Sequence, residues 1–109
     1  MADNWVQIDA AINGEAIYDQ SGKSVSLSAD GSILAIGARW NDGNGNTSGH
    51  VRVYKNANDT WTQVGSDIDG ESSSDQSGES LVLSNDGSIL AIAAKFNDGN
   101  GSNSGHVRV

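Results

Sequence analysis

The stretch "DQSGKSVSLSADGSILAIGA", residues 19–38, decides the fold. Its first half alternates Val25 and Leu27 with serines, which is the two-residue period of a pleated strand. "ADG" at 29–31 is a tight-turn signal. "SILAIGA" at 32–38 is apolar on both faces, as in a strand between two layers. The stretch therefore predicts a β-hairpin.

The chain carries this hairpin twice. The second copy, "DQSGESLVLSNDGSILAIAA", lies 56 residues later at 75–94. With the same offset, residues 5–53 align with residues 61–109 without a gap, and 31 of these 49 positions are identical. Fixed internal periods are typical of solenoids, propellers and repeat arrays.

Each copy continues with further strand signals. A loop rich in Gly and Asn (39–49) precedes "HVRVYK" at 50–55, and a polar turn at 56–59 leads to "WTQV" at 61–64. No segment shows apolar residues at helical spacing. Four short strands joined by hairpins predict one antiparallel sheet, the blade of a β-propeller. The predicted fold class is all-β, with two blade equivalents per chain and a ring completed by oligomerisation.

These residues resemble the FG-GAP repeat, which builds propellers of the integrin-α type. The resemblance rests on both hairpins and on the "GHVRV" strands at 49–53 and 105–109, and it covers essentially the whole chain. Ser21 and Ser77 depart from it, since they stand where the family carries the Phe of its "FG". The family's calcium-binding Asp-x-Asp-x-Asp-Gly hairpin is replaced by "SADGS" and "SNDGS". The resemblance implies the propeller fold and an extracellular or cell-surface parent protein, but it does not carry the metal site across.

The chain begins and ends inside a repeat. Its first residues align with the turn before 61–64, and Val109 aligns with a residue inside a strand of the first copy. These limits predict an excised or engineered piece of a longer protein, whose location the sequence leaves open. Its parts are an outer strand donated to a neighbouring chain (1–9), a complete blade (10–64) and a three-stranded blade (65–109).

An open sheet edge invites pairing with another chain. We expect Trp5–Ile8 of one chain to pair with His106–Val109 of the next, as Trp61–Val64 would pair with His50–Val53 within the chain. A head-to-tail contact of this kind generates a ring if its rotation closes, with six blades from three chains or eight from four. The predicted interface residues are Trp5, Val6, Gln7, Ile8, His106, Val107, Arg108 and Val109.

Composition excludes several function classes. The net charge is −8 with only six Lys and Arg residues, which opposes binding to the phosphates of nucleic acids. No apolar run approaches the roughly 18 residues that a membrane span needs. The absence of cysteine excludes disulfides and thiolate metal ligands. Since only 36% of residues are hydrophobic, the core is expected to be small.

The loop at 39–49 and its copy at 95–105 are the candidate binding sites. Oxygen-bearing side chains at alternate positions are similar to the start of a calcium loop. No bidentate Glu follows, so a plain blade loop is the favoured interpretation, with no cofactor, and calcium is the alternative. The calcium candidates are Asp42, Asn44, Asn46, Asp98, Asn100 and Ser102.

Two aromatic side chains stand at the mouths of these loops. Trp40 and Phe96 beside Asn and Asp form a platform suited to stacking on a sugar. This lectin-like alternative has as its candidate ligand-binding residues Trp40, Asp42, Asn44, Phe96, Asp98 and Asn100.

The histidines raise the question of catalysis, because His titrates near neutral pH. His50 and His106 open identical strands at identical repeat positions. A catalytic site is normally one asymmetric place, so their repetition favours a structural role. The loop "GNGNTSG" also lacks the Lys of a phosphate-binding loop. We therefore predict a non-catalytic structural or interaction module.

Overall fold

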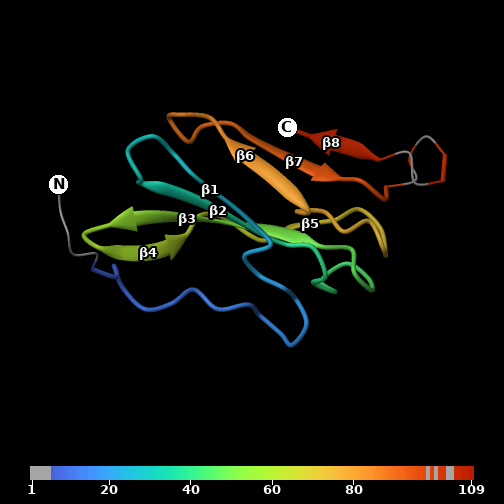
Figure 1. Ribbon diagram of the computed structural model, residues 1–109, viewed down its shortest axis with the longest axis horizontal. Coiled ribbons are helices and arrows are strands. Elements are labelled where there is room, and N and C mark those ends of the chain that lie inside the picture. The colour runs from blue at the N-terminus through green and yellow to red at the C-terminus, as the bar shows by residue number, and fades with distance from the viewer. Residues whose placement is uncertain (1–5, 98, 100, 103–104) are drawn as a thin grey trace.

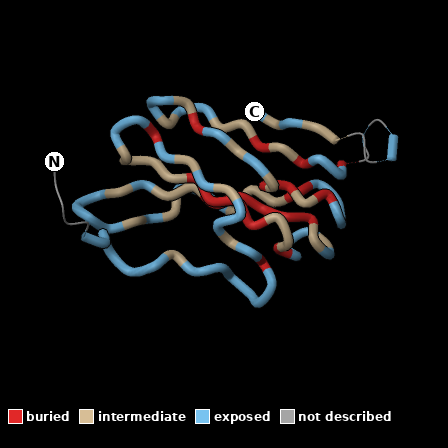
Figure 2. Tube along the Cα trace, in the orientation of Figure 1, coloured by how far each residue is buried: buried red, intermediate tan, exposed pale blue. Residues whose placement is uncertain are grey.

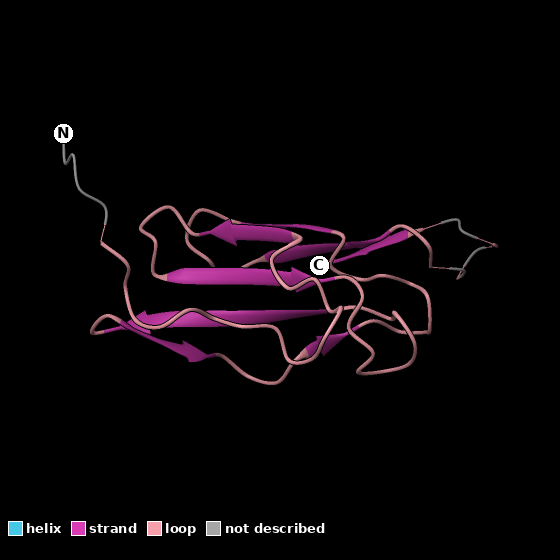
Figure 3. Ribbon diagram, turned by 60° about the horizontal axis from the view of Figure 1, so that its bottom comes forward, coloured by secondary structure: helices cyan, strands magenta, loops and turns pink. Residues whose placement is uncertain are grey.

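The computed structural model describes residues 6–97, 99, 101–102 and 105–109. In these residues strands and turns make up the fold, and no helix is present (Figures 1 and 3). Consequently, none of them forms a helix long and apolar enough to cross a membrane. The strands are β1 (Ser24–Leu27), β2 (Ile33–Ala38), β3 (His50–Ala57), β4 (Thr60–Gln63), β5 (Ile68–Asp69), β6 (Ser80–Leu83), β7 (Leu90–Ala94) and β8 (His106–Arg108).

The first sheet contains the predicted four-stranded blade. Its order is β1-β2-β3-β4, all antiparallel, and the short strand β5 pairs with the start of β3. The turn between β3 and β4 consists of Asn58 and Asp59, which both have positive φ (54° and 63°). Two consecutive left-handed residues are the geometry of the type I′ hairpin turn, which Asn and Asp tolerate well. The polar turn predicted at this place is confirmed.

The second sheet repeats the first three strands. Its order is β6-β7-β8, with Leu81 opposite Ile92 and Ala93 opposite Val107. Val25 and Gly37 hold the corresponding places in the first sheet, opposite Ile36 and Val51. The all-β class and the two repeated sheets are therefore as predicted.

The core lies where the two sheets pack face to face. It consists of Ala35 and Val51 from the first sheet and Leu83 and Ile92 from the second. Figure 2 shows buried residues on these strands and in the loops beside them, while the segment leading into β1 is mostly exposed. Two serines of β1 link the sheets. Ser24 Oγ donates to the Gly78 carbonyl (2.8 Å), and Ser26 Oγ accepts from the Leu83 amide (3.0 Å).

The predicted pairing of Trp61–Val64 with His50–Val53 is wrong. β4 pairs with Tyr54–Ala57, the second half of β3, and only the Val64 amide reaches back to Val53 (2.7 Å). The reason is the two-residue turn, which places Thr60 opposite Ala57 and so fixes the register.

The strand opposite His50 and Val51 is β5. Its repeat counterpart in the first copy is Ile12–Asn13, because 68 − 56 = 12 and 69 − 56 = 13. Gln7 and Ile8 belong to no strand, and Trp5 lies outside the described residues. By repeat symmetry, residues 8–13 correspond to residues 64–69. The pairing of Trp5–Ile8 with His106–Val109 of a neighbouring chain stays a prediction.

Candidate functional site

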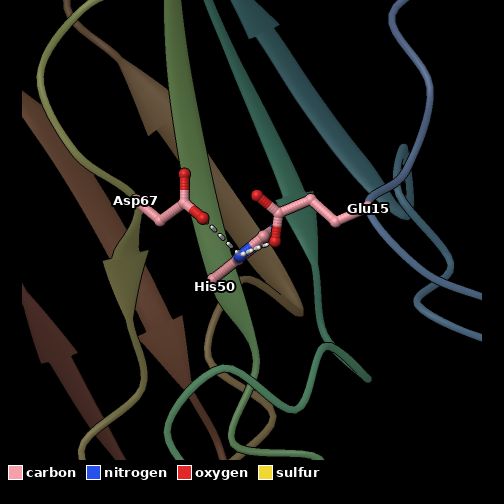
Figure 4. Close-up of side chains that lie close together, drawn as sticks. All are labelled: Glu15, His50 and Asp67. Atoms are coloured by element: carbon pink, nitrogen blue, oxygen red, sulfur yellow. Dashed lines mark ion pairs between the residues drawn. The ribbon is translucent and has the colours of Figure 1, made fainter.

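Two carboxylates converge on a buried histidine. His50 opens β3, Glu15 lies in the segment that leads into β1, and Asp67 comes immediately before β5 (Figure 4). The Nδ1 atom of His50 is 3.6 Å from Glu15 Oε1 and 3.6 Å from Asp67 Oδ2. The three ligand atoms all lie within 4.8 Å of one another. A third carboxylate oxygen, Asp69 Oδ1, is 4.0 Å from the same nitrogen.

The imidazole of His50 is an exception among buried polar groups. The residue is 0% exposed, and neither ring nitrogen has a hydrogen-bond partner among the described residues. Buried polar side chains nearly always have such a partner. The 3.6 Å separations to the carboxylates are longer than a hydrogen bond of this type. The site therefore offers a free, buried nitrogen that faces two negative groups.

Neighbouring amides hold both carboxylates in place. Asn41 Nδ2 donates to Glu15 Oε1 at 3.2 Å. Gln63 Nε2 donates to Asp67 Oδ1 at 2.7 Å, which leaves Oδ2 directed at His50. The carboxylates are thus oriented by the strand β4 and by the loop that precedes β3.

The two carboxyl groups shift each other's titration. The pKa of Glu15 is raised, first by its hydrogen bond with Asp67 and then by its partial burial. Burial also acts to raise the pKa of Asp67, but hydrogen bonds from Gln63 and Glu15 and the charges of His50 and Arg52 outweigh it and lower the value. As the pH falls, Glu15 is the carboxylate that takes up the first proton.

The second copy contains only part of this cluster. His106 Nδ1 is 3.6 Å from Glu71 Oε1, which also accepts from Asn97 at 3.2 Å. These contacts repeat those of His50 with Glu15. The third ligand, Asp67, is not repeated: it aligns with Ala11 at the 56-residue offset, and Ala11 carries no carboxylate. Within the described part of the chain, Glu15, His50 and Asp67 are therefore the group of three that could hold a metal ion.

In the predicted calcium loop at 39–49, the side chains of Asp42 and Asn44 form hydrogen bonds with backbone groups of the loop and of the segment at 70–71. Asp42 Oδ1 accepts from the Thr47 backbone amide (2.8 Å), and the side-chain Nδ2 of Asn44 donates to the carbonyls of Gly70 and Glu71. Asn46 and Ser102 are exposed, while Asp98 and Asn100 lie outside the described residues. Calcium binding by this loop stays a prediction.

The predicted aromatic platforms both carry a cation. The guanidinium carbon of Arg39 is 5.1 Å from the centre of the Trp40 ring, and Lys95 Nζ is 5.1 Å from the centre of Phe96. Each distance is within the range of a cation–π contact. Sugar stacking on these rings also stays a prediction.

The outer faces of the two sheets carry exposed apolar side chains. We call the outer face of the second sheet, formed by Val82, Ala91, Ala93 and Val107, the trailing face. An open hollow lies between its side chains. We call the outer face of the first sheet, formed by Val25, Leu27 and Leu34, the leading face. Val6, Ile8 and Val109 are exposed, and Arg108 donates to the Asp69 carbonyl at 2.9 Å.

Comparison with known proteins supports the interpretation of the repeat. The family model for the FG-GAP repeat matches residues 11–54, which include β1, β2 and the first part of β3, up to Tyr54. The resemblance predicted from the sequence is confirmed there. No curated protein matches the chain.

Proposed function

Because residues 11–54 are an FG-GAP repeat in an all-β chain, we propose that the protein is a non-catalytic interaction module that binds copies of itself head to tail. One observation carries the proposal. The trailing and leading faces are the repeat counterparts of the two faces that pack together within the chain, and both carry exposed apolar side chains.

The equivalence of the faces follows from the repeat. Within the chain, Val51 is 0% exposed because its face packs against Leu83 of the second sheet. Its counterpart on the trailing face, Val107, is 63% exposed. The counterpart of Leu83 on the leading face is Leu27, which is 57% exposed. A second copy of the chain therefore offers each face a partner of the right apolar composition.

A contact that continues the internal one joins different faces and generates a ring if its rotation closes. Propellers of four to eight blades are typical, so three chains would give six blades and four chains eight. Strand pairing would accompany the contact. By analogy with the pairs that β5 forms within the chain, we expect Ile12 and Asn13 of one chain to lie opposite Val107 and His106 of the next.

The contact between chains must differ from the internal one at the place where the backbones of Gly37 and Gly78 lie close together. Gly37 faces Gly78 across the internal contact, and a Cβ atom at Gly37 would collide with the Gly78 carbonyl. The trailing face carries Ala93 at this place and Val82 in place of Ser26. Two chains would therefore sit farther apart near Ala93, and the larger Val82 side chain would help to fill the added space.

Light scattering on the purified chain tests the proposal. We expect the mass of three or four chains, and a monomer with unchanged circular dichroism for Val107→Asp. The matched control is Asn58→Asp, which adds the same charge in the outer turn, at a residue that already has positive φ. A folded monomer of the unmodified chain, or equal effects of both substitutions, would contradict self-association.

A further inference from the structure

Self-association does not explain why Glu15 and Asp67 converge on a buried His50 that has no hydrogen-bond partner in the part of the chain that the structure describes. We propose that these three side chains bind one divalent transition-metal ion per chain, with Zn²⁺ as the best match.

The spacing of the ligand atoms suits a small tetrahedral ion. Zn²⁺ binds His nitrogen and carboxylate oxygen at about 2.0–2.2 Å, which places neighbouring ligand atoms roughly 3.3–3.6 Å apart. His50 Nδ1 is 3.6 Å from an oxygen of each carboxylate. The two carboxylate oxygens lie within 4.8 Å of each other. Since the Glu15 side chain is 42% exposed, a small movement of it suffices to close the set.

The donor types select the metal. An imidazole nitrogen with carboxylate oxygens suits Zn²⁺ and neighbouring transition metals, whereas Ca²⁺ and Mg²⁺ prefer sets made of oxygen alone. Three protein ligands leave a fourth position of a tetrahedral ion for water, as in open zinc sites.

Burial gives the independent reason to place a cation here. His50 is fully buried, and its Nδ1 atom lacks a hydrogen-bond partner although it is directed at two carboxylates. A polar group buried in this way costs free energy unless it is satisfied. A metal ion between the three groups would bind the free nitrogen and offset the negative charge of Glu15 and Asp67.

The surroundings already orient the ligands. Asn41 holds Glu15, and Gln63 holds one oxygen of Asp67 so that the other is directed at His50. Hydrogen bonds of this kind behind the ligands are typical of metal sites and increase their affinity.

The repeat predicts a single site per chain. Glu71 and His106 reproduce two of the ligands, but the repeat counterpart of Asp67 is Ala11. In a head-to-tail assembly the neighbouring chain would bring Ala11 and Asn13 to His106, and neither side chain is a carboxylate. The second copy is therefore an internal control with two ligands in place of three.

Calorimetry on the untagged 109-residue chain, stripped with a chelator and dialysed, tests the site. We expect one Zn²⁺ ion per chain, bound at least 100-fold more tightly than Ca²⁺ or Mg²⁺. Bound Co²⁺ should show the intense visible absorption of tetrahedral coordination. The absence of Zn²⁺ binding, two equal sites per chain, or equal affinity for Ca²⁺ would each overturn the proposal.

Conservative substitutions locate the ion without disturbing the buried imidazole. Asp67→Asn and Glu15→Gln should each weaken Zn²⁺ binding at least tenfold and remove the rise in melting temperature that Zn²⁺ causes. The matched controls, Glu71→Gln and His106→Gln, should leave both quantities unchanged. Wild-type affinity in Asp67→Asn, or a loss of equal size in Glu71→Gln, would contradict this assignment.

Discussion

The two sheets present the same strand sequence in different surroundings. "GHVRV" ends the first copy at 49–53 and the second at 105–109. Val51 is 0% exposed and Val107 is 63% exposed. The side chain of His50 is 1% exposed and that of His106 is 25% exposed. The second sheet covers Val51, while Glu15, Asp67 and Asp69 lie around His50 on the other face. Burial in this fold is thus set by the segments that pack against each strand, and local sequence cannot specify it.

The largest expected effect is at Gly37, whose backbone lies against the backbone of Gly78 near the start of β6, whereas its repeat counterpart is Ala93. Gly37→Ala places a methyl group against the Gly78 carbonyl, which the sheet holds in place. Overpacking of this kind costs about 3 kcal/mol, and we expect the free energy of unfolding to fall by that amount. The counterpart, Ala93→Gly, should cost no more than about 1 kcal/mol, the usual effect of Gly in a strand.

Urea denaturation of both variants at one protein concentration measures this difference. Because Ala93 lies on the trailing face, light scattering on Ala93→Gly adds a second reading. Removal of its methyl group restores the close approach seen at Gly37, so association should be kept or strengthened. Equal losses of stability in the two variants would show that the sheets do not pack as described.

A smaller difference is expected at the paired valines. Val51→Ala removes buried methyl groups from the core and should lower the free energy of unfolding by about 2 kcal/mol. Val107→Ala should change it by less than about 0.5 kcal/mol when the chain is dilute and dissociated. At concentrations where chains associate, Val107→Ala should instead weaken association. A loss near 2 kcal/mol for Val107→Ala in the dissociated chain would refute the exposure of the trailing face.

The sequence predicted the hairpins because their signals are local. Alternation around Val25, the turn residues and the repeat itself led to strands that the structure confirms. β5 was missed because two residues, Ile68 and Asp69, carry no period, and they become a strand only by pairing with β3. The register of β4 was wrong because a turn of two residues, Asn58 and Asp59, was predicted as a turn of four.

The site was missed for a different reason. The three residues Glu15, His50 and Asp67 are far apart in the sequence. They meet only because the segment before β1 and the residues around β5 pack against β3. The repetition of His50 as His106 favoured a structural role for both. The available signal was the difference between the copies, since Ala11 and Asn13 become Asp67 and Asp69 in an otherwise similar segment.

The smallest expected effect concerns a turn that is the same in both copies. Asp30 Oδ1 accepts hydrogen bonds from the Ser32 hydroxyl (2.7 Å), the Ser32 amide (2.9 Å) and a preceding serine, and Asp86 makes the same contacts with Ser88. The Ser32 and Ser88 bonds come first among the causes that lower the pKa of each carboxyl below its ordinary value of 3.8.

The sign of the pH effect follows from these lowered values. Because the folded pKa lies below the unfolded one, the turns contribute their full stability above about pH 4 and lose it as the pH falls through the folded pKa. NMR titration should therefore give midpoints below 3.8 for both Asp30 and Asp86. Ser32→Ala and Ser88→Ala should raise the midpoint of the adjacent Asp and flatten the acid dependence of the urea midpoint to the same extent. The Ala29 amide bonds to the Asn85 carbonyl, so the two turns touch, and unequal midpoints would show that this contact changes one carboxylate more than the other.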